Sequence, residues 1–386
     1  MRQRTDLVFA MPEYERRLAE LRARMAARGV DALLVTTPEN LFYLTGYETQ
    51  GLWYFAGLVV PLVGEPFMCT RHAEDTVVES DTWISLSRPF RDDQDSMAVL
   101  ADACREFGLA GKRIGYERSS YFFRASEQDG LFGRLSGTVF VDCSHIVEDG
   151  RVIKSAPEIE MIRRAARASE GGVGAGVAAV RAGATENEVA AEVYRGMLLA
   201  GGHYCSMQPF VVSGPRAFVS HATWRDRRIA QGDCVFFEIG GTVHRYNAPM
   251  MRTISVGEPG TDLREAEALV IEAMAAVESK IKPGVPTGEA DAAGRAVIAR
   301  NRFGATQYTR VGYSMGIACT PGWGEGHIID IKPGDPRLFR ENMCFHVIPF
   351  LQIPGKSAVG ISAVVRVTAT GCEPIHTLER KLYVVA

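Results

Sequence analysis

Hydrophobic positions in the first part of the chain switch repeatedly between helical and strand spacing. Near the N-terminus, four apolar residues recur three or four positions apart: Tyr14, Leu18, Leu21 and Met25. This spacing predicts a helix that ends at Gly29. The short apolar runs DALLVTT, PFMCT, RIGYE and TVFVDC are typical of buried strands, and helical segments such as MAVLADACREFG alternate with them. The alternation predicts a small α/β domain over residues 1–150.

Two capping boxes mark the starts of helices after this domain. Ser155 is followed three residues later by Glu158, and Thr185 by Glu188. Strand patterns dominate further along, apart from the helical stretches LREAEALVIEAMAAVESKI and TGEADAAGRAVIARNRFG. These patterns predict a second domain of the α+β class over residues 151–386, with helices on one side and a curved antiparallel sheet on the other.

The segment CVFFEIGGTVHRYNAPMMRTISVG, residues 234–257, has the pattern of two strands joined by a turn. It places a carboxylate, Glu238, between Phe237 and Ile239 in an otherwise apolar run. A buried carboxylate costs several kcal/mol unless it is paired or used in chemistry. Glu238 is therefore a candidate for a functional acid, and the structural alternative is a salt bridge to Arg252 inside the sheet.

Composition and charge narrow the classes of function. The chain of 386 residues is 46% hydrophobic and 23% charged, which fits a globular protein of two domains. Its formal net charge of −3, without a block of Lys or Arg, gives no electrostatic basis for binding nucleic acid or a membrane surface. No apolar run approaches the ~20 residues that span a bilayer. The cysteines are scattered without a C-x-x-C pair, which favours a reduced, cytoplasmic protein over a zinc knuckle or a secreted disulfide scaffold.

Three segments resemble the pita-bread family, whose members include methionine aminopeptidase, aminopeptidase P, prolidase and creatinase. RVIKSAPEIEMIRRA is similar to the linker and first helix of the two-domain members, and QGDCVFFEIGG with YNAPMMRT is similar to the family's first metal-ligand hairpin. VSGPRAFVSHATW resembles the segment that carries the active-site histidine, here His221. The resemblance spans nearly the whole chain and implies a pita-bread catalytic domain. It also implies a homodimer in which the small domain of one subunit covers the pocket of the other.

The peptidases of this family hold two metal ions through two Asp, one His and two Glu side chains. Carried onto this sequence, the five ligand positions fall on Glu238, Pro249, Tyr313, Ile348 and Ser362. Pro249 and Ile348 have no side-chain donor, and one carboxylate cannot hold two divalent ions. The resemblance therefore predicts that the chain is not a metallopeptidase and uses neither a metal nor another cofactor.

Two kinds of pita-bread enzyme act without a metal, the creatinases and the ectoine hydrolases. Creatinases keep a Glu at the positions of Met251 and Ile348, which disfavours that identity here. VFFEIGG, HRYNAP, GYSMG, PGWGE, KPGD and NLFYLTGYETQGLWYF all resemble ectoine hydrolases. The resemblance implies a metal-independent hydrolase that opens a small cyclic amidine bearing a carboxylate, giving an N-acetyl-diaminobutyrate from ectoine. The alternatives are a creatinase-like amidinohydrolase, another C–N hydrolase acting on a related small molecule, and an inactive family member that serves as a binding protein.

Three residues are expected to carry the reaction. Glu238 would pair with the ring N–H groups and act as a base or a covalent nucleophile, and its apolar neighbours in sequence would raise its pKa. Histidine titrates in the range needed to shuttle a proton to the departing nitrogen, which is the role expected for His221. Tyr313 would donate a hydrogen bond to the tetrahedral centre. The structural alternatives are a satisfied buried histidine at 221 and a tyrosine that only fills space at 313.

Further residues are expected to bind the substrate. Arg252, or as a second choice Arg245, would hold its carboxylate in a two-pronged contact. The other candidates lie in or near the motifs quoted above: Trp53, Tyr54, Tyr246, Trp323 and Glu325. The tryptophans and Tyr54 would clamp a flat cation, a contact that contributes ~1–2 kcal/mol when desolvated, and Trp53 would act from its own or the partner subunit. Structural alternatives are an Arg252 that braces the hairpin and tryptophans that pack in the core; His346 is expected to point into the core.

Overall fold

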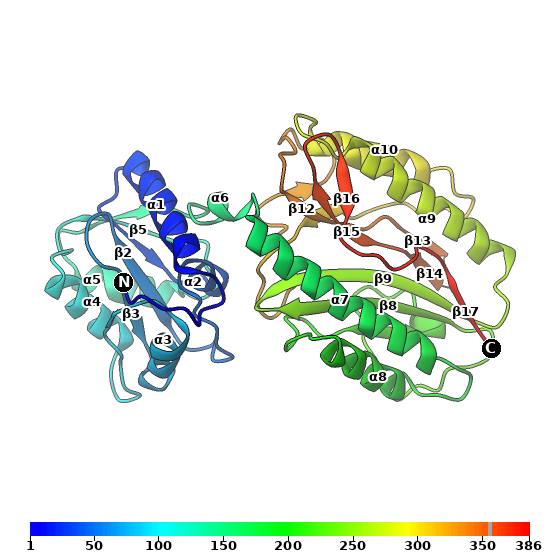
Figure 1. Ribbon diagram of the computed structural model, residues 1–386, viewed down its shortest axis with the longest axis horizontal. Coiled ribbons are helices and arrows are strands. Elements are labelled where there is room, and N and C mark those ends of the chain that lie inside the picture. Colours follow the sequence, from blue (N-terminus) through cyan, green and yellow to red (C-terminus); the bar gives the residue numbers. More distant parts are fainter. Residues whose placement is uncertain (354–356) are drawn as a thin grey trace. The chain divides into compact units, whose positions relative to one another are not determined.

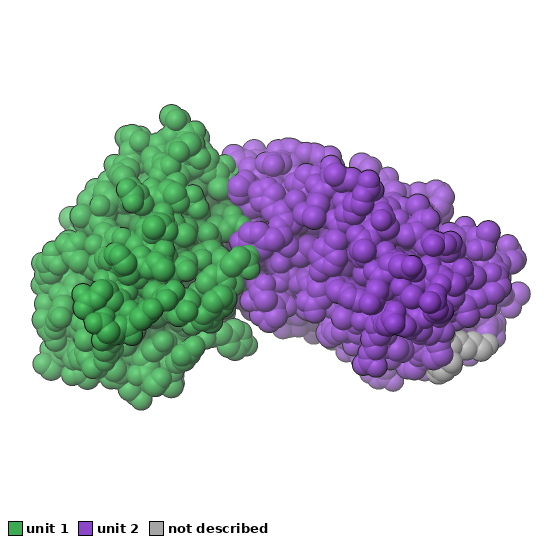
Figure 2. All heavy atoms as spheres, turned by 90° about the horizontal axis from the view of Figure 1, so that it is seen from below, with its two compact units in different colours: residues 1–151 green, residues 152–386 purple. Residues whose placement is uncertain are grey.

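The computed structural model describes residues 1–353 and 357–386 and divides them into two compact units. Unit 1 spans Met1–Arg151 and unit 2 spans Val152–Ala386 (Figure 1, Figure 2). The division predicted from the sequence lies one residue earlier, after residue 150. Among the described residues, no helix combines the length and the apolar character that crossing a bilayer requires.

Unit 1 is an α/β domain built on one six-stranded sheet in the order β4-β3-β2-β1-β5-β6. Its strands are β1 (Ala32–Val35), β2 (Ala56–Pro61), β3 (Phe67–Thr70), β4 (Leu86–Ser87), β5 (Arg113–Tyr116) and β6 (Val139–Asp142). Its helices are α1 (Met11–Arg28), α2 (Pro38–Thr45), α3 (Asp75–Asp81), α4 (Ser96–Glu106), α5 (Ala125–Arg134) and α6 (Glu148–Arg151). The sheet is mixed, because β2 runs antiparallel to both β1 and β3.

Most of the elements predicted for unit 1 are confirmed. The four apolar residues of the predicted first helix are buried along α1, and the helix ends at Gly29 in the left-handed conformation, with φ 66°. The four predicted apolar runs form β1, β3, β5 and β6. The sequence pattern missed β2, because its segment AGLVVP contains Ala, Gly and Pro, which are depleted in strands.

Unit 2 combines four long helices with three sheets. The helices are α7 (Ala156–Ala179), α8 (Glu186–Leu199), α9 (Thr261–Lys280) and α10 (Thr287–Ile298). A four-stranded sheet has the order β17-β9-β8-β7, with β7 (Phe210–Ser213), β8 (Cys234–Val243), β9 (Tyr246–Val256) and β17 (Tyr383–Val385). A five-stranded sheet has the order β11-β10-β12-β15-β16, with β10 (Gly312–Ser314), β11 (Asp330–Ile331), β12 (Cys344–Val347), β15 (Ala363–Val367) and β16 (Cys372–Pro374). The third sheet pairs β13 (Phe350–Ile353) with β14 (Ser357–Gly360).

Helices pack against the strands of unit 2, which confirms the predicted combination of helices and sheet in an α+β domain. Helix α7 packs on β8 and β9, while α9 contacts β13 and β14 and α10 contacts β11 (Figure 1). Both predicted capping boxes are confirmed at the starts of α7 and α8. The Ser155 backbone N–H donates to the Glu158 carboxylate at 2.9 Å, and the Thr185 N–H to the Glu188 carboxylate at 2.7 Å.

The predicted hairpin over residues 234–257 is confirmed as β8 and β9. The two strands pair continuously from Cys234 opposite Ser255 to Val243 opposite Tyr246. The two residues of the turn, His244 and Arg245, both have positive φ, 44° and 62°. This is the backbone geometry of tight hairpin turns, whose twist matches that of the strands they join. The turn therefore fixes the register that aligns Glu238 with its neighbours.

Candidate active site

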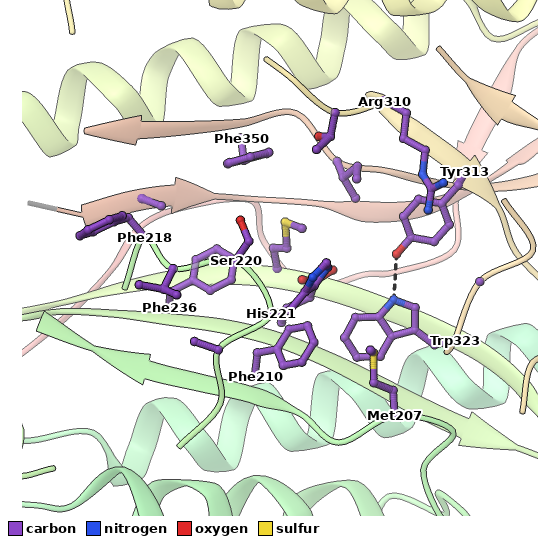
Figure 3. A pocket seen from close by; sticks show the side chains of 18 of the residues that line it. Met207, Phe210, Phe218, Ser220, His221, Phe236, Arg310, Tyr313, Trp323 and Phe350 are labelled. Carbon is purple, nitrogen blue, oxygen red and sulfur yellow. Dashed lines mark hydrogen bonds between the residues drawn. The ribbon is translucent and has the colours of Figure 1, made fainter. Parts of the chain in front are cut away.

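Unit 2 contains a cavity of about 660 Å³ between its strands (Figure 3). The strands contribute the side chains of Phe210 (β7), Phe236 and Glu238 (β8), Met251 (β9), Tyr313 (β10) and Phe350 (β13). The loop residues 217–222 and 322–324 complete much of the remaining wall. Most of these side chains are aromatic or apolar, which is typical of a site for a small organic molecule.

Three residues that lie opposite one another in the four-stranded sheet share one wall of this cavity. Phe210 lies opposite Glu238, and Glu238 lies opposite Met251. Residues paired across antiparallel strands present their side chains on the same face. Phe237 and Ile239 alternate to the other face, where they pack in the core formed with α7 and α8. The apolar setting of Glu238 therefore comes from the adjacent strands, which corrects the expectation that Phe237 and Ile239 provide it.

The carboxyl group of Glu238 is buried without a partner. The residue is 8% exposed, and among the described residues no hydrogen bond or ion pair to it is found. Burial raises the pKa of this carboxyl group to about 8. A buried, unpaired acid with a raised pKa at the wall of a cavity is a marker of a functional site.

Arg252 forms neither the salt bridge to Glu238 nor the substrate contact that the sequence suggested. Its guanidinium donates to the backbone carbonyl oxygens of Met251, Ser362 and Leu378 at 2.7, 2.9 and 3.0 Å. Arg252 follows Met251 directly on β9, so its side chain alternates to the face away from the cavity. The residue is fully buried and braces the hairpin, which was the structural alternative.

Trp323 lines the cavity next to β8, where Gly240 leaves room for its indole. A Cβ atom on Gly240 would lie 2.7 Å from Trp323 Cε3, which is closer than a side chain can approach. The ring centroids of Trp323 and Phe210 are 5.2 Å apart. The indole Nε1–H donates to the Tyr313 hydroxyl at 2.9 Å, the contact drawn in Figure 3. The structure thus brings Glu238, Tyr313 and Trp323 to one cavity.

The Tyr313 hydroxyl also contacts a buried histidine. Its oxygen lies 2.8 Å from His346 Nδ1, and His346 Nε2 lies 2.7 Å from Ser362 Oγ. His346 is fully buried and does not line the cavity, in agreement with the expectation that it packs in the core. It nevertheless shares a face with Tyr313, because the two residues lie opposite each other on β10 and β12. Burial raises the pKa of Tyr313 well above its usual value and lowers the pKa of His346 well below its own. At neutral pH the phenol therefore keeps its proton and the imidazole is neutral.

His221 reaches the cavity from the loop after β7. Its backbone has φ 56°, its side chain is exposed, and its ring centroid lies 5.7 Å from that of Phe210. Figure 3 shows the imidazole between Phe210 and Ser220. Exposure at the cavity excludes the structural alternative of a satisfied buried histidine.

Three other predicted residues do not line the cavity. The Tyr246 hydroxyl donates to Glu158 of α7 at 2.9 Å, on the helix-covered face of β9. Glu325 forms an ion pair with Lys154 at 2.7 Å, with both side chains 1% exposed. Arg245, the second choice for a carboxylate contact, donates to the Tyr204 carbonyl oxygen at 2.5 Å and stacks on the Tyr204 ring. The buried contacts of these residues indicate structural roles.

Trp53 and Tyr54 belong to unit 1, so the cavity in unit 2 does not test their predicted role. Trp53 is 66% exposed, and its ring centroid lies 5.4 Å from that of Tyr54. The guanidinium of Arg71 lies 4.2 Å from the Tyr54 ring centroid. An exposed tryptophan beside a tyrosine is available to cover a ligand, and the cation-clamping role of both residues stays a prediction.

Besides Glu238, three more charged residues line the cavity, and the sequence did not single them out as site residues: Arg310, Asp330 and Lys332. The Arg310 guanidinium lies 4.6 Å from the Tyr313 ring centroid and 3.4 Å from an Asp330 carboxylate oxygen. Figure 3 shows Arg310 beside Tyr313. A sequence signal was available, because Arg310 stands three residues before the predicted site residue Tyr313.

Comparisons with known proteins identify the family. Residues 160–369 match metallopeptidase family M24, and residues 17–153 match the creatinase/prolidase N-terminal domain. The chain belongs to metallopeptidase family M24. This confirms the predicted pita-bread catalytic domain after a creatinase-like N-terminal domain, and it makes the protein a member of a hydrolase family.

Proteins similar to this M24 protein include hydrolases that are named for different activities. The chain is 29% identical over 402 residues to ectoine hydrolase of Halomonas elongata, which covers 98% of this chain and 99% of the relative. It is 30% identical over 391 residues to an uncharacterized hydrolase/peptidase of Sinorhizobium fredii, with the same coverage. Among solved structures, X-Pro aminopeptidase of Thermotoga maritima has a TM-score of 0.83 at 24% identity, over 95% of this chain and 99% of that one. The prolidase of Pyrococcus horikoshii has a TM-score of 0.82 at 24% identity, over the same shares.

The cavity of this M24 protein does not fit the two-metal centre that its family name implies. Of the five carried-over ligand positions, Pro249 and Ile348 offer no donor, and Ser362 turns its hydroxyl to His346. Across residues 1–353 and 357–386, no group of three or more His, Cys, Asp or Glu side chains is placed to hold a metal ion. The side chains around Glu238 therefore lack the several carboxylate and imidazole ligands that two divalent ions need.

Proposed function

We propose that this M24 protein is a metal-independent hydrolase that opens a small cyclic amidine, such as ectoine, by cleaving a C–N bond. The observation that carries the proposal is the buried, unpaired carboxyl group of Glu238 in a cavity walled by aromatic rings. Such an acid is stabilised by an organic cation, and a flat amidinium suits the faces of Phe210 and Trp323. The similarity to ectoine hydrolase of Halomonas elongata supports this class of substrate.

Binding of the amidinium activates Glu238. A cation within contact distance favours the ionised carboxylate and lowers the pKa that burial has raised. The carboxylate then takes a proton from a water molecule whose oxygen bonds to the amidine carbon. Alternatively a Glu238 oxygen bonds to that carbon itself, and after the ring has opened a water molecule adds to the same carbon and breaks this bond, which frees the product and Glu238. His221 delivers a proton to the ring nitrogen as the C–N bond breaks. By either route one water molecule is consumed, and ectoine yields an N-acetyl-diaminobutyrate.

Arg310 replaces Arg252 as the candidate that holds the substrate's carboxylate. It lines the same cavity as Glu238, and its side chain is 41% exposed. Its contact with Asp330 is 3.4 Å long, beyond the range of a strong charge-assisted hydrogen bond, so the guanidinium can turn to a ligand. The cavity then offers a carboxylate, Glu238, for the cationic ring and a guanidinium, Arg310, for the carboxylate of a zwitterionic substrate.

The rival functions are weaker on the same observations. Met251 and Ile348 line the cavity with apolar side chains where a creatinase needs further acids to grip a guanidinium. An inactive binding protein has no need to keep both His221 and Glu238 at one cavity. We propose a cytoplasmic homodimer whose partner subunit supplies the small domain over each cavity, without nucleic-acid or membrane partners.

Turnover assays with paired ligands test the proposal. We expect the purified protein to open ectoine at a rate that chelators do not change, with no stoichiometric metal in elemental analysis. Glu238→Gln should lower turnover by a factor of about 100 or more, because the base or nucleophile is lost. Hydrolysis of Xaa-Pro dipeptides that depends on added manganese, with no reaction of ectoine, would overturn the proposal.

A second assay tests Arg310. We expect Arg310→Gln to raise KM for ectoine about 10-fold to 100-fold, because a charge-assisted contact to the carboxylate is lost. The matched control is a cyclic amidine without a carboxylate, whose affinity for the cavity should be the same in both proteins. An equal loss of affinity for both ligands would show that Arg310 acts on the shape of the cavity instead.

A further inference from the structure

A chain of hydrogen bonds lies behind the Tyr313 hydroxyl. The Met251 N–H donates to Ser362 Oγ at 2.6 Å, and Ser362 Oγ lies 2.7 Å from His346 Nε2. His346 Nδ1 lies 2.8 Å from the Tyr313 hydroxyl oxygen, which also accepts the Trp323 Nε1–H at 2.9 Å. His346 and Ser362 are fully buried, whereas Tyr313 lines the cavity. The chain therefore runs from the hairpin through the interior to the edge of the substrate site.

The hydrogens along this chain can be ordered in two ways, which differ in the tautomer of His346. With the proton on Nε2, His346 donates to Ser362 and accepts from the Tyr313 hydroxyl. Ser362 Oγ then accepts two hydrogen bonds, and its own hydroxyl hydrogen has no acceptor among the described residues. A buried donor left without an acceptor is unfavourable, which argues against this tautomer.

The other tautomer gives the Ser362 hydroxyl hydrogen an acceptor and leaves a single hydroxyl hydrogen of the chain, that of Tyr313, without one among the described residues. Ser362 accepts from the Met251 N–H and donates its hydroxyl hydrogen to His346 Nε2. His346 Nδ1–H then donates to Tyr313, whose oxygen receives two hydrogen bonds, one from His346 and one from Trp323. The Tyr313 hydroxyl hydrogen is left over at a residue that lines the same cavity as Glu238, where a bound group can accept it.

We propose that Ser362 and His346 are positioning residues that hold the Nδ1–H tautomer and thereby direct the Tyr313 hydroxyl hydrogen into the cavity. His346 stays neutral because burial opposes its charged form. Toward a bound ligand, Tyr313 is then a fixed donor and not an acceptor, because its oxygen already accepts from His346 and Trp323. The site consequently favours a bound group that accepts a hydrogen bond at this point and carries a cation toward Glu238.

The tautomer of His346 does not depend on the identity of the substrate. The catalytic role of the directed Tyr313 hydroxyl rests on the proposed function. During opening of a cyclic amidine, the oxygen that adds to the amidine carbon becomes an acceptor in the tetrahedral species. A preoriented hydroxyl meets this oxygen without first breaking a hydrogen bond elsewhere, which is the condition for selective stabilisation of that species. Ser362, the position to which the resemblance assigns one metal ligand of the family's peptidases, would here serve a hydrogen-bond chain.

The tautomer can be measured in the intact protein without any assay of activity. Protein with ¹⁵N-labelled histidine rings gives distinct signals for protonated and unprotonated ring nitrogens, and loss of one set in His346→Asn assigns it. We expect His346 to carry its proton on Nδ1 at neutral pH. A proton on Nε2, a mixture of tautomers or a charged ring would overturn the proposal. If His346→Asn does not fold, the shift of the same signals in Ser362→Ala provides the assignment.

A double-mutant cycle tests whether Ser362 acts through Tyr313. We expect Ser362→Ala to lower kcat about 10-fold with a change in KM of less than about twofold, because Tyr313 loses its fixed orientation. Ser362→Thr, which keeps the hydroxyl, should restore most of this rate. Tyr313→Phe should abolish the effect, so that the double variant turns over no more slowly than Tyr313→Phe alone. Independent losses that multiply, or an unchanged kcat in Ser362→Ala, would refute the relay.

The two experiments separate this inference from the proposed function. If the protein does not open ectoine but His346 shows the Nδ1–H tautomer, only the proposed substrate is refuted. A protein that opens ectoine but shows the Nε2–H tautomer refutes only the positioning role.

Discussion

Glu238 is buried by the fold before any ligand is present, and this has a thermodynamic consequence. The ordinary pKa of a glutamate is near 4.5, and burial raises that of Glu238 to about 8. Between these two values the folded protein holds a proton that the unfolded chain releases. The stability that comes from this proton is complete below the lower value and is lost as the pH rises through the upper one. Ionisation of the buried Glu238 carboxyl group therefore lowers the stability of the fold in alkaline solution.

We predict that Glu238→Gln changes the pH dependence of stability. A neutral amide needs no proton, so the variant should gain stability over the wild type as the pH rises from about 5 to about 9, by at most ~5 kcal/mol. Urea unfolding of both proteins across this range measures the difference. Glu258→Gln is the control, because Glu258 is 85% exposed and should leave the profile unchanged. Parallel profiles for wild type and Glu238→Gln would contradict the assigned pKa.

At the scale of single residues, the sequence predicted the carboxylate of the site, Glu238, but not the arginine that lines it, Arg310. Glu238 stands out because a carboxylate interrupts an apolar strand, and this pattern can be recognised without knowing which residues lie near it in space. Arg252 and Arg310 look equivalent in sequence, since each lies close to a family motif. They differ in their surroundings, because Arg252 is buried on the face of β9 away from the cavity, whereas Arg310 precedes β10 and lines the cavity. Arg252 could have been excluded by alternation from Glu238 and its neighbour Met251, but only once the register of the hairpin was known.

At the scale of elements, the β8–β9 hairpin was predictable because its pattern is local. Its strands, its turn and the alternation of its side chains all lie within residues 234–257. The contact of Tyr313 with His346 was not predictable, because it depends on pairing between β10 and β12, which lie about thirty residues apart in the chain. Long-range register of this kind is set by packing, and no local pattern encodes it.

Position 240 of β8 requires a glycine, because a Cβ atom there would clash with the indole of Trp323. We predict that Gly240→Ala displaces Trp323, breaks its hydrogen bond to Tyr313 and lowers turnover at least about 10-fold. The overpacked side chain should also lower the free energy of unfolding by ~1–3 kcal/mol. Turnover, urea unfolding and the tryptophan fluorescence spectrum report these effects separately.

Gly174 provides the matched control for this substitution. It lies within α7, and a Cβ atom there would meet nothing within 4 Å. Gly174→Ala should keep wild-type turnover and raise stability by up to ~1 kcal/mol, because alanine favours the helix. If Gly240→Ala behaves like this control, the packing of Trp323 on β8 is not needed for the site.

At the scale of the whole molecule, family membership fixes the scaffold and leaves the chemistry open. The solved relatives in fold are peptidases, and the chain matches them over nearly its whole length. The positions that lack the metal-ligand side chains expected from the resemblance are few, and they include Pro249 on β9 and Ile348 just after β12. A fold of this kind tolerates them because metal ligands project into a cavity and are not part of the packed core.

The last prediction concerns how the two units of different subunits cooperate. Trp53 lies on unit 1 and Glu238 on unit 2, and the proposed homodimer would place Trp53 of one subunit over the cavity of the other. Trp53→Ala should then lower turnover with little effect on stability, because the side chain is 66% exposed. Mixing this variant with the inactive Glu238→Gln protein, under conditions that allow subunit exchange, decides the matter. In a mixed dimer, the subunit with Glu238 intact receives an intact Trp53 only from its partner, so restored activity would place Trp53 across the interface. Activity that stays at the sum of the two separate variants would instead place Trp53 over its own subunit's cavity or remove it from the site.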